Sequence, residues 1–143
     1  LDVTFKLRYT AKQGGSRFAN EVKGILKPYN ATSFFDLAFN FTDEWIELTE
    51  GDRAQATLSF TPEMFPNLSS SKIVGLLIHY QYEGSGGGAI FTINDSLQVP
   101  QDTYLQPNAL SVGRNGSDWT FKLVGDRTTL RNAEMVVVYK ASV

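Results

Sequence analysis

The chain contains no cysteine and a single histidine, His79. The lack of cysteine excludes a disulfide framework, a thiolate nucleophile and a thiolate–metal site. One histidine without cysteine would leave carboxylates to supply most zinc ligands, so we expect no metal site of that kind and no cofactor. His79 lies within a predicted strand, and we expect a hydrogen-bonded strand residue there rather than a catalytic one.

Long apolar runs and clusters of one charge sign are also missing. Thirteen basic and fifteen acidic residues give a net charge of −2, without the basic density that nucleic acid binding demands. No run approaches the ~20 apolar residues of a membrane helix. We therefore expect no nucleic acid partner and no membrane insertion by this segment. The chain begins at Leu1 without a visible signal peptide, so we interpret residues 1–143 as one domain of a processed or larger protein.

The sequence does contain repeated two-residue alternation of apolar and polar side chains, as in Val3, Phe5, Leu7 and Tyr9. This period places successive side chains on opposite faces of half-buried strands. The fold class predicted is all-β, an antiparallel two-sheet β-sandwich with jelly-roll or immunoglobulin-like connections and nine to ten strands. Strands or hairpins are expected within residues 2–11, 18–25, 34–41, 45–48, 53–60, 72–82, 90–99, 111–124 and 133–141.

Turn signals separate these runs. Thr61 and Pro62 begin, and Pro66 ends, one short helical turn near residues 61–66. Hairpins are predicted about Asn94-Asp95 and about Asn115-Gly116. The residues expected in one core are Phe5, Leu7, Phe39, Leu58, Phe60, Leu76, Ile78, Phe121, Leu123 and Val137.

Two segments resemble ligand sites only in part. The acidic residues between Asp43 and Asp52 match no EF-hand spacing, so a solvated face is favoured over a weak calcium site. The glycine-rich segment 84–88 lacks the Gly-Lys-Ser/Thr ending of a phosphate-binding loop and is interpreted as a flexible connection. It borders two tyrosines, and function concentrates on loops.

Aromatic residues are the best candidates for recognition, because they stack on sugar rings and anchor protein interfaces. Trp45 has charged neighbours in phase and is expected to be exposed, with Asp43 beside it. Tyr80 and Tyr82, with Gln81 between them, form the second candidate. These five residues are the predicted ligand-binding residues.

Five of the eight asparagines begin an Asn-X-Ser/Thr triplet, where chance predicts about one or two. They are Asn30, Asn40, Asn67, Asn94 and Asn115. The excess favours a secreted glycoprotein, although a chain rich in Asn, Ser and Thr would show the same pattern.

Three classes of function remain. The favoured hypothesis is a non-catalytic recognition module that binds a glycan or a cell-surface receptor, as part of a secreted, surface or toxin-like protein. The alternative is a structural domain that packs against neighbouring domains or copies of itself. An enzyme is least favoured, because no nucleophile set or metal cluster is visible. We expect an extracellular or cell-surface location.

Overall fold

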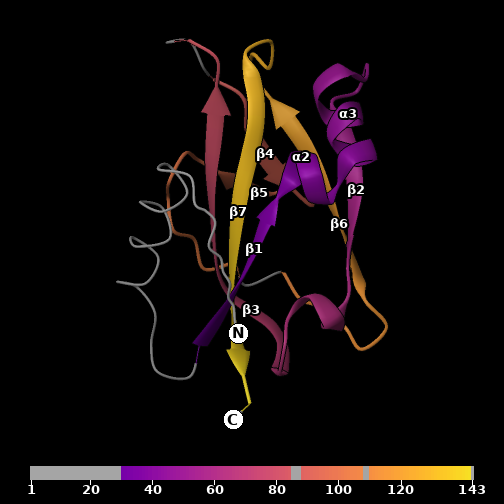
Figure 1. Ribbon diagram of the computed structural model, residues 1–143, viewed down its shortest axis with the longest axis vertical. Coiled ribbons are helices and arrows are strands. Elements are labelled where there is room, and N and C mark those ends of the chain that lie inside the picture. The colour runs from indigo at the N-terminus through magenta and orange to yellow at the C-terminus, as the bar shows by residue number, and fades with distance from the viewer. Residues whose placement is uncertain (1–29, 85–87, 108–109, 143) are drawn as a thin grey trace.

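The chain folds into two packed antiparallel sheets, as shown by a computed structural model that describes residues 30–84, 88–107 and 110–142 (Figure 1). One sheet has the order β1-β7-β3, with β1 at Asn30–Asp36, β7 at Leu130–Ala141 and β3 at Leu68–Tyr82. The other has the order β2-β6-β4-β5, with β2 at Gln55–Phe60, β6 at Ser117–Val124, β4 at Ile90–Ile93 and β5 at Leu97–Val99. The predicted two-sheet β-sandwich is confirmed.

The order of the strands follows the jelly-roll alternative. The first and last strands of the described residues are neighbours, and the β1–β2, β2–β3, β3–β4 and β6–β7 connections all cross between the sheets. Between β5 and β6 the chain runs along the free edge of β3, where it forms isolated bridges such as Leu76↔Leu105 and Lys72↔Ser111. This segment therefore covers an edge that would otherwise expose unpaired backbone groups.

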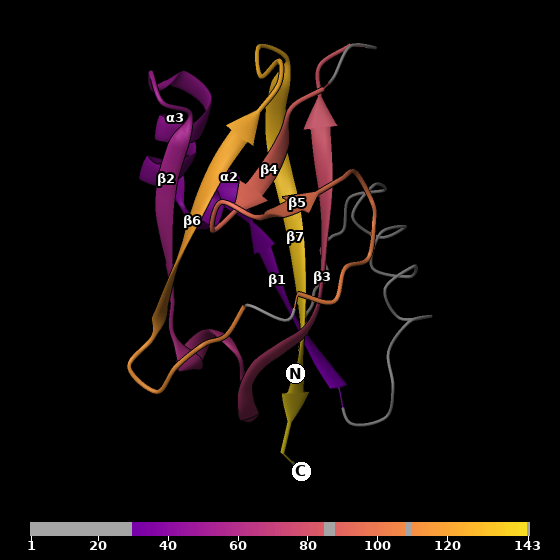
Figure 2. The same cartoon turned by 180° about the vertical axis from the view of Figure 1, so that it is seen from behind.

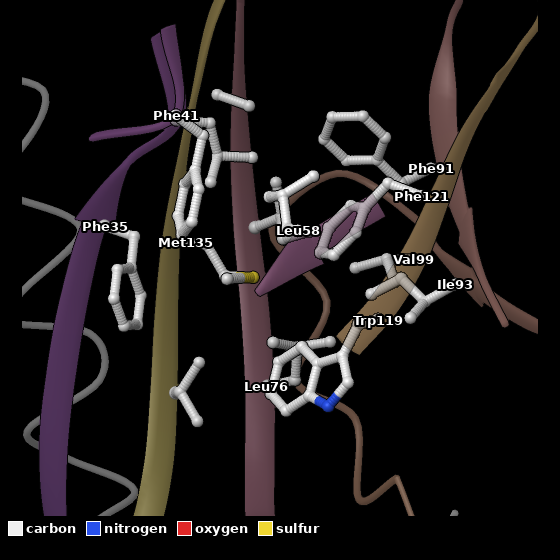
Figure 3. Packing of buried hydrophobic residues seen from close by; sticks show 14 of the residues in the cluster. Phe35, Phe41, Leu58, Leu76, Phe91, Ile93, Val99, Trp119, Phe121 and Met135 are labelled. Carbon is white, nitrogen blue, oxygen red and sulfur yellow. The ribbon is translucent and has the colours of Figure 1, made fainter. Parts of the chain in front are cut away.

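The core lies between the sheets and is dominated by aromatic rings (Figure 3). Phe60 of β2 packs against Trp119 of β6 with ring centroids 4.1 Å apart, and Phe35 of β1 meets Phe60 edge-on at 5.4 Å. Seven of the predicted core residues are confirmed as buried: Leu58, Phe60, Leu76, Ile78, Phe121, Leu123 and Val137.

The strand predicted over 45–48 is wrong, and the strand predicted over 34–41 is confirmed only for residues 34–36. Extended structure ends at Asp36, and the chain continues as helix α2 at Leu37–Asn40 and helix α3 at Thr42–Glu50. Asp36 starts α2 because its Oδ1 accepts a hydrogen bond from the Phe39 backbone N–H, as an N-cap does. Figure 2 shows α3 beside β2, at the edge of the four-stranded sheet, whereas α2 lies nearer the middle of the molecule and contacts β7 and α3. The described part of the chain holds seven strands, below the nine to ten predicted.

The helices change which aromatic residues are buried. Leu37, Phe41, Trp45 and Leu48 follow helical spacing and face the core. Phe39 points away from it and is 79% exposed, so its predicted place in the core is wrong. A side chain two residues from a buried one shares its face in a strand but not in a helix.

One of the two predicted hairpins and the predicted helical turn are confirmed. Asn94 and Asp95 both have positive φ, 52° and 65°, and connect β4 to β5 as predicted for a tight hairpin. The short helical turn is a 3-10 helix, η2, at Pro62–Met64. A turn also closes at Gly116, whose N–H bonds to the Gly113 carbonyl. The arm before this turn bridges β3 rather than β6, so the hairpin predicted there is wrong.

Several expectations fall on residues that are not described. The strand predicted over 2–11 with Phe5 and Leu7, the stretch 18–25 and the centre of the glycine segment 84–88 lie outside the described residues.

Candidate functional site

Trp45 lies in α3 and is buried, so its predicted exposure is wrong. The side chain is 9% exposed, and its ring meets Phe91 of β4 edge-on at 6.5 Å. Asp43 lies two residues earlier and is exposed in the first turn of α3 beside Glu44. Carboxylates at that position stabilise the positive end of the helix dipole, which gives Asp43 a structural role.

The second predicted site is mostly structural too. Tyr80 is 1% exposed, and its hydroxyl donates to the Val99 carbonyl at 2.6 Å and accepts from the Phe91 N–H at 2.9 Å. Burial raises the pKa of Tyr80 far above the usual value of a tyrosine, because the phenolate would lose its hydration. The expected aromatic platform is therefore not formed by Tyr80.

Tyr82 and Gln81 are partly buried at the end of β3. The Tyr82 ring stacks on Tyr80 at 6.3 Å, and its hydroxyl donates to the Ala89 carbonyl. Partial burial raises the pKa of Tyr82. The ring and the hydroxyl group of Tyr82 thus both contact other residues of the protein, although part of the side chain remains accessible to solvent.

A cavity of about 290 Å³ lies between the C-terminal part of α3 and the connection from β6 to β7. Its lining combines apolar, hydroxyl and charged side chains: Trp45, Thr49, Glu50, Arg127, Thr128, Leu130 and Arg131. Of the five predicted site residues, Trp45 is the one that the structure places in this lining. The other four, Asp43, Tyr80, Gln81 and Tyr82, are not brought to the cavity.

Hydrogen bonds hold the two walls of this cavity in place. Arg127 donates from Nη1 to the Leu48 carbonyl at 2.7 Å, which places a cation at the negative end of α3. Asp126 accepts from both the backbone and the hydroxyl of Thr128, at 3.0 and 2.7 Å. The hydroxyl bond, followed by the backbone bond, lowers the pKa of Asp126. The β6–β7 connection is thereby fixed against the helix.

Arg131 completes the wall from β7. It donates to the Thr128 carbonyl at 3.2 Å and forms an ion pair with Glu83. A guanidinium carries five N–H donors, so neither arginine is saturated by these bonds. Glu50 adds an acceptor at the same rim. The cavity therefore offers donors, acceptors and an apolar wall around one half-open space.

His79 lies in β3 and is hydrogen-bonded, as the sequence indicated. Its Nδ1 is 2.9 Å from Oδ1 of Asp102, and it is not among the residues that line the cavity.

Within the described residues, no three His, Cys, Asp or Glu side chains are grouped in a way that could hold a metal ion. No helix of the described chain is long and apolar enough to cross a membrane.

Comparison with known proteins found no match to any protein family, curated protein or solved structure.

Sequence reasoning missed the arginines of the cavity. Arg127 follows Gly125-Asp126, a turn signal, and is 79 residues from its partner Leu48. One local feature could have indicated these arginines. Functional residues concentrate on loops, and Arg127 and Arg131 lie at a polar connection between two strands.

Proposed function

We propose that this domain is a non-catalytic recognition module that binds a saccharide in the cavity beside Trp45. The observation that carries the proposal is the composition of that cavity. Trp45 and Leu130 supply apolar surface, and Arg127, Arg131 and Glu50 supply hydrogen-bonding groups around it. A sugar ring presents apolar C–H faces and a rim of hydroxyl groups, so both kinds of surface are matched.

The size of the cavity favours a small ligand. About 290 Å³ lies just below the range of about 300–1,000 Å³ for ligand pockets. The ligand is therefore a terminal sugar residue rather than an extended chain. Terminal sugars are displayed on cell surfaces and secreted proteins, and this supports an extracellular setting for the domain.

The fold by itself is compatible with recognition and with assembly. Jelly rolls occur in lectins and in viral capsid proteins, and a fold does not determine a function. Assembly is the competing function, and it predicts that the isolated chain associates with itself.

The test is a glycan array with the wild-type chain and three variants. Arg131→Ala removes a charged donor from the cavity, and Trp45→Phe keeps an aromatic ring in the core while shrinking the apolar wall. Arg114→Ala is the matched control, because Arg114 is an exposed arginine in the turn that closes at Gly116. A lost charged hydrogen bond costs about 1.5–3 kcal/mol, so Arg131→Ala should weaken binding about tenfold or more.

Trp45→Ala is a poor test of binding. Removing a buried tryptophan costs about 3–5 kcal/mol of stability, so lost binding would be confounded with unfolding. Equal affinity of the Arg131 and Arg114 variants would place the site elsewhere. An array without any bound glycan, together with an oligomer in sedimentation analysis, would overturn recognition in favour of assembly.

A further inference from the structure

Among the described residues, Phe39 has the most exposed large apolar side chain. It is 79% exposed on α2, whereas Leu37 and Phe41 on either side of it are buried. Leaving a phenylalanine in water forgoes the stabilisation that its burial would give. The next residue, Asn40, begins the triplet Asn40-Phe41-Thr42, which is a glycosylation acceptor motif.

The Asn40 side chain is accessible in the folded domain. Its Oδ1 accepts the Asp36 backbone N–H at 2.7 Å, and Asn40 is exposed. The hydrogen bonds of the described residues do not use its Nδ2, which is the atom that glycosylation modifies. Thr42, the third residue of the motif, is exposed as well.

The other four acceptor asparagines support the same modification of the chain. Asn67, Asn94 and Asn115 are exposed, and Asn30 is partly buried in β1. Glycosylation of an unfolded chain is compatible with folding only where the acceptor ends on the surface. All five acceptors meet that condition to some degree, as asparagines in folded proteins generally do, so the fold permits modification at each of them.

We propose that Asn40 carries an N-linked oligosaccharide whose first sugar ring covers Phe39. In the transfer step, Nδ2 attacks C1 of a lipid-linked pyrophosphate oligosaccharide. The Nδ2–C1 bond forms, the C1–O bond to the pyrophosphate breaks, and one Nδ2 proton passes to a base of the transferase. The product keeps Oδ1 and one N–H, so the bond to Asp36 survives.

The exposed ring of Phe39 distinguishes Asn40 from the acceptors Asn94 and Asn115. The apolar face of a sugar ring can shield an exposed aromatic ring from water. Asn94 and Asn115 lie in turns next to Asp95 and Gly116, which offer no such ring. This inference does not depend on the saccharide site beside Trp45, because the sugar here is covalently attached on another face of the helical segment.

The first test uses protein isolated from the organism that makes it. Mass spectrometry of its peptides, before and after enzymatic release of N-glycans, should show Asn40 converted to aspartate by the release. The peptide must be cut between Asn30 and Asn40 so that the two acceptors are resolved. An unmodified Asn40 in that material would overturn the proposal.

The second test asks whether Phe39 contacts the sugar. In secreted material, enzymatic removal of the glycans should lower the midpoint of thermal unfolding by about 2–4 °C in the wild type and in Thr42→Ser. Thr42→Ala, which destroys the acceptor motif but keeps Asn40, should remove this difference. Phe39→Ala should remove it too while the glycan remains attached, whereas Asn115→Gln should keep it. A full difference in Phe39→Ala would overturn the contact.

Discussion

The hydroxyl group of Tyr80 ties β3 to both β4 and β5, and its removal is the sharpest test of the fold. Tyr80→Phe keeps the ring, which packs on Phe91 at 5.6 Å, and deletes one oxygen atom. That oxygen donates to the Val99 carbonyl and accepts from the Phe91 N–H. Phe91 and Val99 are fully buried, so neither backbone group can turn to water.

The expected loss of stability follows from these two orphaned groups. A buried donor or acceptor without a partner costs about 1–3 kcal/mol. We expect Tyr80→Phe to lower the free energy of unfolding by about 2–4 kcal/mol, which is less than the upper limit of the sum because the variant no longer buries a hydroxyl. Urea unfolding should show a lower midpoint with an unchanged slope.

Tyr82→Phe is the matched control. Its hydroxyl also bonds to a backbone carbonyl, that of Ala89, but from a partly buried position. Ala89 is buried as well, but Tyr82→Phe leaves one backbone group without a partner where Tyr80→Phe leaves two, so we expect a smaller loss of about 1–2 kcal/mol. If both variants lose the same stability, or Tyr80→Phe loses none, the bonds of the Tyr80 hydroxyl do not hold the strands together.

Three further predictions concern other parts of the chain. Burial raises the pKa of Tyr80, so the folded state holds this proton to higher pH than the unfolded chain does. The free energy of unfolding, measured between pH 8 and 11, should be constant below about pH 10 and fall by up to about 1.4 kcal/mol per pH unit above it. This fall should be smaller in Tyr80→Phe. Ala54 has a φ of 51°, so Ala54→Gly should stabilise the domain by about 0.5–1 kcal/mol in urea unfolding, whereas Ala56→Gly in β2 should destabilise it. His79→Gln should lower stability by about 0.5–3 kcal/mol and leave glycan binding intact; complete loss of binding in a folded variant would refute the structural role of His79.

The segment from Phe35 to Leu48 shows why part of the fold was predicted and part was not. Phe35, Leu37, Phe39 and Phe41 have the period of a strand, while Leu37, Phe41, Trp45 and Leu48 have that of a helix. Both patterns are present in the same stretch of sequence. The helix forms because Asp36 caps it and because its apolar face covers rings at the edge of the sandwich, with Phe41 5.3 Å from Phe60.

The candidate site could be predicted only in part for a related reason. Trp45 was singled out, but its expected exposure came from charged neighbours two residues away, a criterion that holds for strands. In the helix, Trp45 shares its face with Phe41 and Leu48 and reaches both the core and the cavity.

The sequence by itself determined the two-sheet sandwich, the hairpin at Asn94-Asp95 and seven residues of the core, because alternation and turn chemistry are local properties of the chain. The tertiary structure alone decided the jelly-roll order, the helical segment and the cavity. Those features depend on contacts between distant residues, such as Arg127 with the Leu48 carbonyl 79 positions away. No local pattern specifies which distant groups will meet, because that is settled by which apolar faces the whole chain can bury together.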